Sequence, residues 1–319
     1  MSNLDRASDE HYYEIANHSV VRMEPGSTFK TVSLMAALDD GEIKMSDTIR
    51  VYEDGWWYHG AKHKDSHPSD TVYTIRQSLA VSSNIALAKI VTDGYDGSAK
   101  KFVKKLKDMG LCDSVDYTIP GAKQALIQVP KDTVTISKMA YGYSVELSPL
   151  QILMFYNGIA NDGKMIAPLF VKEIRKKGKI IEEYESCVVN GRMCDASTLQ
   201  GIRECLHDVV WDNELGTASV NPWGTRKAQS DLVSIAGKTG TAQIREKGYS
   251  DSRHRMSFVG YFPEENPEYS CICVIHAPQW PYDAGLDCGT VVRQIAEKTM
   301  AYAGEYVIKD GDFVLTVRE

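Results

Sequence analysis

Residues 24–41 read EPGSTFKTVSLMAALDDG, and they predict the central helix of the protein. Glu24-Pro25-Gly26 breaks the preceding segment, Ser27 can cap the helix, and Gly41 ends it. The apolar positions between the two ends cover nearly every side of the helix, which is typical of a helix buried in a core. We therefore expect a buried helix over residues 27–38.

The composition indicates a globular protein that is not built for nucleic acid. The chain has 319 residues, of which 43% are apolar and 25% charged. Its net charge of -7 argues against a basic face that could track phosphates. No stretch approaches the ~20 apolar residues of a membrane span, and no secretory signal opens the chain. Seven scattered cysteines favour buried free thiols over a disulfide scaffold or a zinc site.

The periodicity predicts helices before and after a sheet. We expect helices at 76–92, 98–109, 148–159 and 291–303, and strands at 232–244, 257–262 and 269–276. The three strands follow one another closely, so they predict an antiparallel meander. The fold class is therefore α+β, with an antiparallel sheet flanked by helices. Because no repeat or linker divides the chain, we expect a single domain over 1–319.

The first motif is Ser27-Thr28-Phe29-Lys30, which on a helix places a hydroxyl and an amine on neighbouring turns of one face. The positive end of the helix dipole favours an alkoxide on Ser27. Lys30, pointing into an apolar interior, loses hydration and can then accept a proton from the serine. Taken alone, the motif is equally typical of a helix cap with a snorkelling lysine.

Two further motifs complement the first. Lys238-Thr239-Gly240-Thr241 lies on a predicted strand, so period-2 alternation puts the two threonine hydroxyls on one face, where they can hold a carboxylate. Gly240 leaves room for a ligand along the strand, although a bulge is the alternative explanation. In Ser82-Ser83-Asn84, Ser82 can relay a proton and the Asn84 amide can orient a substrate amide, although the pattern by itself is an N-cap.

The order S-x-x-K, S-x-N, K-T-G is typical of β-lactamases and penicillin-binding proteins. The chain resembles the transpeptidase domain of class B penicillin-binding proteins, especially the division type, from about Asn3 to Ala303. The resemblance is carried by Met23 to Lys30, Ser82-Ser83-Asn84, Tyr141-Gly142-Tyr143, Ser148-Pro149-Leu150-Gln151, Ala160-Asn161-Asp162-Gly163, Ala236-Gly237-Lys238-Thr239-Gly240-Thr241-Ala242 and Ser257-Phe258-Val259-Gly260-Tyr261-Phe262-Pro263.

The resemblance implies a serine D,D-transpeptidase that cross-links peptidoglycan stem peptides in cell division and is acylated by β-lactams. It implies that Ser27 is the nucleophile and Lys30 its general base. Ser82 and Asn84 would relay a proton and hold the substrate, and Lys238 would give electrostatic support. The substrate carboxylate would be bound by Thr239, Gly240 and Thr241. The oxyanion hole would be the N–H groups of Ser27 and Thr241. No metal or organic cofactor is implied.

The resemblance also implies a setting for the protein. Expected partners are a lipid-linked peptidoglycan precursor and division proteins including a glycosyltransferase, at the periplasmic face of the bacterial inner membrane. The family's membrane anchor and pedestal domain are absent from this sequence, and its start lies so near the first motif that we expect the N-terminal strand of the sheet to be truncated.

Three other activities share the motifs. A D,D-carboxypeptidase differs only in using water as acceptor, and a penicillin-sensing domain would acylate without turnover. A class A β-lactamase needs a glutamate after the second motif, but none occurs between Asn84 and Glu146. A class D-like β-lactamase, which uses a modified lysine in the first motif, stays open.

His59, His63 and His67 recur every four residues, which would suit a metal on a helix. Gly60, Pro68 and the neighbouring tryptophans indicate a loop instead, so we expect an exposed loop and no metal site.

Overall fold

The structure, a computed structural model, describes residues 5–6, 12–13, 16–112, 119, 121–244, 253–278, 282–303, 306–309 and 312–315. Most of the N-terminal segment in which we expected a truncated strand lies outside these ranges. Among the described residues, no helix has both the length and the apolar character needed to cross a bilayer.

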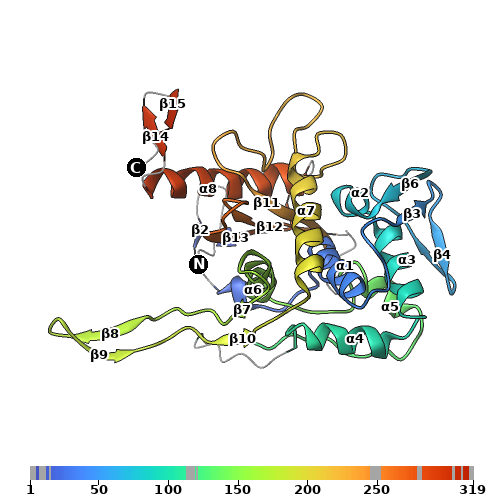
Figure 1. The fold of residues 1–319 in the computed structure, drawn as a ribbon, viewed down its shortest axis with the longest axis horizontal. Helices are drawn as coiled ribbons and strands as arrows, with labels where there is room; N and C mark the ends of the chain where they lie inside the picture. Colours follow the sequence, from blue (N-terminus) through green and yellow to red (C-terminus); the bar gives the residue numbers. More distant parts are fainter. Residues whose placement is uncertain are drawn as a thin grey trace.

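The helices and strands follow the expected α+β order (Figure 1). The helices are η1 (His18–Val20), η2 (Gly26–Thr28), α1 (Phe29–Asp39), α2 (Ile75–Ala80), α3 (Asn84–Gly94), α4 (Ala99–Asp108), α5 (Thr135–Met139), α6 (Pro149–Ala160), α7 (Ala196–Trp211), the π-helix η3 (Gly285–Gly289) and α8 (Thr290–Tyr302). The strands are β1 (Asp5–Arg6), β2 (Tyr12–Tyr13), β3 (Thr48–Val51), β4 (Trp56–Tyr58), β5 (Ala61–His63), β6 (Thr71–Thr74), β7 (Met165–Ile166), β8 (Glu173–Lys176), β9 (Lys179–Glu183), β10 (Val188–Asn190), β11 (Ala236–Ile244), β12 (Arg253–Phe262), β13 (Tyr269–His276), β14 (Tyr306–Lys309) and β15 (Asp312–Leu315).

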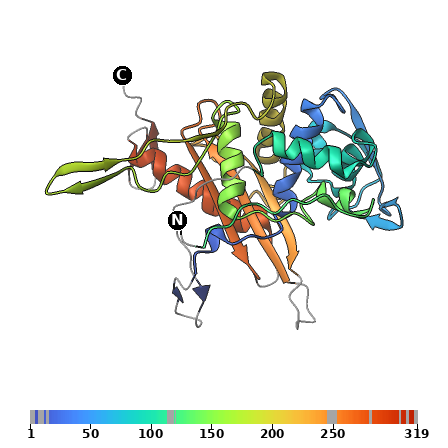
Figure 2. The ribbon, with the colours of Figure 1, turned by 90° about the horizontal axis from the view of Figure 1, so that it is seen from below.

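The antiparallel meander is confirmed: β11, β12 and β13 pair in that order, with β11 at one edge. Alternate residues of β12 belong to different cores. Val259 and Tyr261 belong to the core that includes Phe155 of α6, whereas Phe258 belongs to the core that includes Val292 of α8. Helices therefore cover both faces of the sheet, as Figure 2 shows with α6 and α8 on opposite sides.

The central helix α1 is buried as predicted, because its apolar residues face neighbours on every side. Its start differs from the prediction. Ser27 does not cap the helix, since α1 begins at Phe29 and Ser27 lies in the preceding 3₁₀ turn η2. Gly26, at a φ of +58°, turns the chain into η2. At the other end Gly41 has a φ of +72° and its N–H bonds the carbonyl of Leu38, as expected of a helix terminator.

The helix expected over 76–92 is two helices, α2 and α3. Ser82 separates them at a φ of +58°, a left-handed conformation that a non-glycine residue adopts only where its surroundings hold it. Ser83 then caps α3, its Oγ accepting from the N–H of Ala86 at 2.9 Å. Periodicity alone does not show this break, because both halves keep a buried apolar face.

The cysteines are all free among the described residues, but not all are buried. Cys194, Cys205 and Cys288 are buried, whereas Cys187 is exposed. Cys187 follows the hairpin of β8 and β9, which extends away from the rest of the molecule in both views (Figures 1 and 2).

Candidate active site

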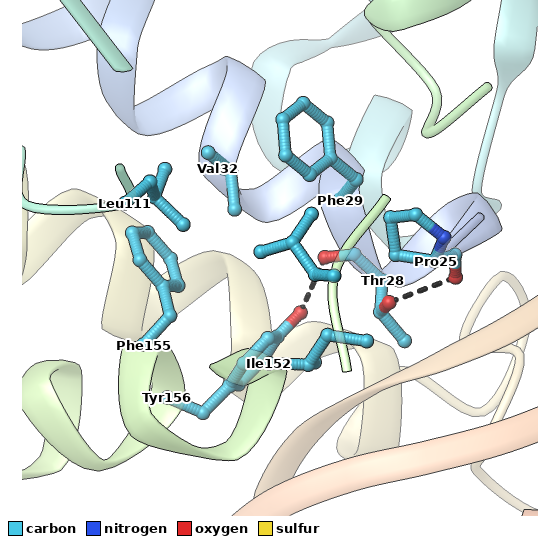
Figure 3. A pocket seen from close by; sticks show the side chains of 9 residues that line it. Pro25, Thr28, Phe29, Val32, Leu111, Ile152, Phe155 and Tyr156 are labelled. Atoms are coloured by element: carbon cyan, nitrogen blue, oxygen red, sulfur yellow. Dashed lines mark hydrogen bonds between the residues drawn. The ribbon is translucent and has the colours of Figure 1, made fainter. Parts of the chain in front are cut away.

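Ser27 is half-buried in the turn that leads into α1. Hydrogen bonds from α6 hold the backbone around it. Tyr156 Oη of α6 donates to the carbonyl of Thr28 at 2.9 Å and lies 2.8 Å from Thr31 Oγ1. Thr28 Oγ1 donates to the carbonyl of Pro25 at 3.0 Å. Figure 3 shows the bonds from Tyr156 to Thr28 and from Thr28 to Pro25, beside a cavity of about 10 Å³ that is lined by apolar groups and is too small for a substrate. The turn is thus supported by protein on its inner side, and Ser27 itself has no side-chain hydrogen bond among the described residues.

The segment around Gly142 supports the same turn from another side. Gly26 N donates to the carbonyl of Gly142 at 3.2 Å, and a Cβ at Gly142 would come 2.1 Å from the Gly26 carbonyl oxygen. Gly142 also has a φ of +90°, which a side chain disfavours. Only glycine allows the two backbones to approach this closely next to Ser27.

Gly142→Ala is expected to lower the free energy of unfolding by about 3 kcal/mol, from left-handed strain and the steric clash together. It should also slow acylation, because relief of the clash moves the Ser27 turn. Gly224→Ala is the matched control: Gly224 has a φ of +82°, but no atom lies within 4 Å of its built Cβ. Thermal unfolding and acylation rates are measured on both variants. Equal losses of stability and of rate in the Gly142→Ala and Gly224→Ala proteins would contradict the prediction.

Lys30 is buried, and its Nζ lies against Ser82. It donates to Ser82 Oγ at 3.0 Å and also to the Ser82 carbonyl. Burial lowers the pKa of Lys30 to about 7, against a smaller opposing effect from the charge of Asp65. At neutral pH a large fraction of the amine is therefore uncharged and able to accept a proton.

Lys238 of β11 reaches the same hydroxyl. Its Nζ donates to Ser82 Oγ at 2.9 Å and to the carbonyl of Thr239 at 3.0 Å. Burial, and then the nearby charge of Lys30, lower the pKa of Lys238 well below its usual value. The structure thus brings the first, second and third motifs together at Ser82 Oγ. The two amines that flank this hydroxyl repel each other when both are charged, so the doubly charged state is unfavourable.

Asn84 opens α3 beside this cluster. Its Nδ2 donates to the carbonyl of Lys64 at 2.8 Å, which fixes the amide plane. The sequence suggested a substrate-orienting amide here, and the amide is half-buried and preoriented.

In β11, Thr239 and Thr241 differ in exposure. Thr239 is buried and Thr241 is exposed, so Thr241 is the accessible hydroxyl. The absent side chain of Gly240 makes room for protein atoms: a Cβ there would come 2.4 Å from Ser257 Oγ and 2.8 Å from Thr28 Cγ2. Glycine is therefore needed for β11 to contact the turn that carries Ser27.

The N–H of Thr241 points away from β12. Gln243 N donates to Tyr143 Oη at 3.1 Å, and the Thr239 carbonyl accepts from Lys238, so both groups face the open edge of the sheet. In an antiparallel ladder the backbone groups of residues two apart point the same way. Thr241, which lies between them, therefore presents its N–H at that edge, as an oxyanion hole requires.

The sequence did not reveal Thr217. It follows α7 in a segment without a motif, yet its Oγ1 lies 2.7 Å from Thr239 Oγ1 and its N–H bonds the carbonyl of Ala80 at 3.2 Å. Lys227 Nζ holds the Thr217 carbonyl at 3.2 Å. Thr217 therefore orients the Thr239 hydroxyl.

Thr217→Val keeps the shape of the side chain but removes this hydrogen bond. We expect the second-order rate constant of β-lactam acylation to fall about 3–10-fold, the value of one hydrogen bond. Thr217→Ser, which keeps the hydroxyl, should retain most of the rate. Equal rates for the valine and serine variants would mean that the hydroxyl does nothing for binding.

The histidines do not share a face. His63 is buried at the end of β5, with Nδ1 2.8 Å from Tyr141 Oη and Nε2 3.0 Å from Ser137 Oγ. Burial, and secondarily Lys138, lower the pKa of His63 to about 4, so the ring is neutral. His59 and His67 are exposed. The expected loop is a hairpin of β4 and β5, because Gly60 permits a tight turn.

Comparison with known proteins identifies the family. The family model for the penicillin-binding protein transpeptidase domain matches residues 5–300. The chain belongs to this family. The curated relatives confirm the class B type: a probable peptidoglycan D,D-transpeptidase PenA of Neisseria flavescens is 26% identical over 90% of this chain and 67% of its own length. Stage V sporulation protein D of Bacillus subtilis is 25% identical over 87% of this chain and 41% of its own length.

Solved structures confirm the fold of this transpeptidase domain. Penicillin-binding protein 2X from Streptococcus thermophilus superposes with a TM-score of 0.80 at 21% identity, covering 92% of this chain and 43% of that one. Penicillin-binding protein 3 from Mycobacterium tuberculosis, solved with aztreonam, gives 0.75 at 23% identity, covering 91% and 65%. The chain thus spans between about two fifths and two thirds of the length of these four proteins.

Proposed function

We propose that this chain is a peptidoglycan D,D-transpeptidase that works through an acyl-enzyme on Ser27 and is acylated by β-lactams. The observation that carries the proposal is the convergence of Lys30 and Lys238 on Ser82 Oγ, next to the turn of Ser27. The names of the relatives, which include peptidoglycan D,D-transpeptidases, support the same activity.

In the proposed acylation, neutral Lys30 takes the proton of Ser27 Oγ, which attacks the carbonyl of the penultimate D-Ala. The N–H groups of Ser27 and Thr241 stabilise the oxyanion, and the Thr241 hydroxyl, with Thr239 beside it, binds the terminal carboxylate. Ser82 passes its proton to the leaving amine of D-Ala and takes up the proton that Lys30 removed, while Lys238 holds the Ser82 hydroxyl in place. A stem-peptide amine then attacks the ester carbonyl and loses a proton to Lys30, which returns it to Ser27 Oγ as the bond between the acyl carbon and that oxygen breaks.

The setting is part of the proposal. We propose one transpeptidase domain over residues 1–319 that acts outside the cytoplasm at the bacterial inner membrane, on a lipid-linked precursor, with division proteins including a glycosyltransferase. The name of one relative, a peptidoglycan D,D-transpeptidase FtsI homolog of Mesostigma viride, supports the peptidoglycan part of this proposal.

The test supplies the purified chain with a donor peptide ending in D-Ala-D-Ala and an amine acceptor, and measures free D-Ala and the transfer product. Transfer product supports the transpeptidase, whereas D-Ala release with hydrolysis only indicates a D,D-carboxypeptidase. Intact-mass spectrometry after incubation with benzylpenicillin, together with a measurement of penicillin hydrolysis, separates the remaining alternatives. A stable adduct without peptide turnover indicates a sensing domain. Rapid penicillin hydrolysis indicates a β-lactamase, and the absence of both adduct and hydrolysis overturns the assignment.

A further inference from the structure

Asp65 makes a set of contacts with the second motif that its sequence position did not indicate. Its Oδ2 accepts from Ser83 Oγ at 2.7 Å, and its Oδ1 accepts from the N–H of Asn84 at 2.5 Å and of Ile85 at 3.0 Å. A carboxylate that accepts several N–H bonds at a helix start is strongly held, because both charge and dipole favour it there. Asp65 therefore ties the turn between Ser82 and Asn84 to the loop that follows β5.

That loop is itself held in place. His63, two residues before Asp65, is buried and bonded through both ring nitrogens to Ser137 and Tyr141. The carbonyl of Lys64 accepts from Asn84 Nδ2 at 2.8 Å. The segment 63–65 thus bridges the second motif and the chain around Gly142, which supports the Ser27 turn.

Asp65 also carries the acidic charge that acts on Lys30. Lys238 of β11 shares the Ser82 hydroxyl with Lys30, and Asp65, in the loop after β5, is the acidic group whose charge acts on Lys30. The negative charge of Asp65 raises the pKa of Lys30, in opposition to the larger effect of burial. Without that charge, the amine would lose its proton at a lower pH.

We propose that Asp65 is a positioning residue of the reaction, which holds the turn of Ser82 and Asn84 in place beside Lys30. This inference rests on the proposed function. It adds a residue outside the three motifs to the parts that determine the acylation rate, and it gives the hairpin of β4 and β5 a role in supporting the site.

The experiment measures the acylation rate by a fluorescent penicillin from pH 5 to 9. Asp65→Asn removes the charge and puts an amide nitrogen, which cannot accept, where Oδ2 accepts from Ser83 Oγ, so that bond is either reversed or lost. We expect the plateau rate to fall about 10²-fold through misplacement of the second motif. The midpoint of the acid limb should move about one pH unit lower, because Lys30 loses an opposite charge.

Two further variants separate charge from position. Asp65→Glu keeps the charge but changes its reach, so its plateau should fall while its midpoint stays. Asp70→Asn makes the same chemical change at an exposed residue that pairs with Arg50 at 2.6 Å, and it should change neither quantity.

A lowered melting temperature for Asp65→Asn with an unchanged rate and midpoint would overturn the inference, since Asp65 would then be only a helix cap. If the asparagine variant does not fold, Asp65→Glu decides: a wild-type plateau overturns the inference and a reduced one supports it. Failure of the wild type to acylate at any pH would instead overturn the proposed function.

Discussion

Ser27→Ala is expected to abolish the covalent adduct with benzylpenicillin. Ser27 is the proposed nucleophile, and loss of a serine nucleophile typically costs roughly 10⁶-fold in rate. Fold should be unaffected, because the Ser27 hydroxyl neither caps α1 nor bonds a described neighbour. Intact-mass spectrometry after incubation with the antibiotic measures the result directly.

Ser33→Ala is the matched control for this experiment. Ser33 lies in α1, the helix that follows the turn of Ser27, is fully buried and has an Oγ without a hydrogen-bond partner among the described residues. Its removal should leave the adduct intact. An adduct of one penicillin mass on the Ser27→Ala protein would show that another residue is the nucleophile.

Lys30→Met is expected to slow acylation by about 10²–10⁴-fold, the usual contribution of a general base. The pH dependence of the wild type gives a second, independent result. Because the pKa of Lys30 is lowered to about 7, the uncharged amine that can accept a proton increases as pH rises through 7. The acylation rate should therefore rise about tenfold per pH unit below that value and level off above it.

Stopped-flow measurement of the acylation rate at a series of pH values tests this acid limb, the rise in rate below pH 7. Lys100→Met provides the control, because Lys100 is exposed on α4 and should leave both the rate and the limb unchanged. A wild-type rate that is flat between pH 5 and 9, or a Lys30→Met protein that keeps its acid limb, would show that Lys30 is not the base.

Several features of the fold follow from short stretches of sequence. Ser148 and Pro149 predicted the start of α6, and the structure shows a capping box between Ser148 and Gln151. The strand at 269–276 coincides with β13. Caps, turn residues and periodicity act over one or two turns of chain, so the local sequence contains the information that determines them.

The start of α1 shows where local reasoning fails. A serine before an apolar run reads as a cap, but Gly26 packs against Thr241 and Gly142, far away in the chain, and this contact places Ser27 in a 3₁₀ turn. Likewise, Asp65 and Thr217 lie outside every motif. Their roles arise only because folding brings them to Asn84 and Thr239.

The sequence by itself determined the fold class, the family and the residues proposed to do the chemistry, because motif order and hydrophobic period are properties of the linear chain. Tertiary structure alone decided how those residues act. The two bonds to Ser82 Oγ join it to Lys30 and Lys238 across 52 and 156 positions of the chain. The pKa of Lys30 depends on burial by segments distant in sequence, so the acid–base chemistry of the site exists only once the chain has folded.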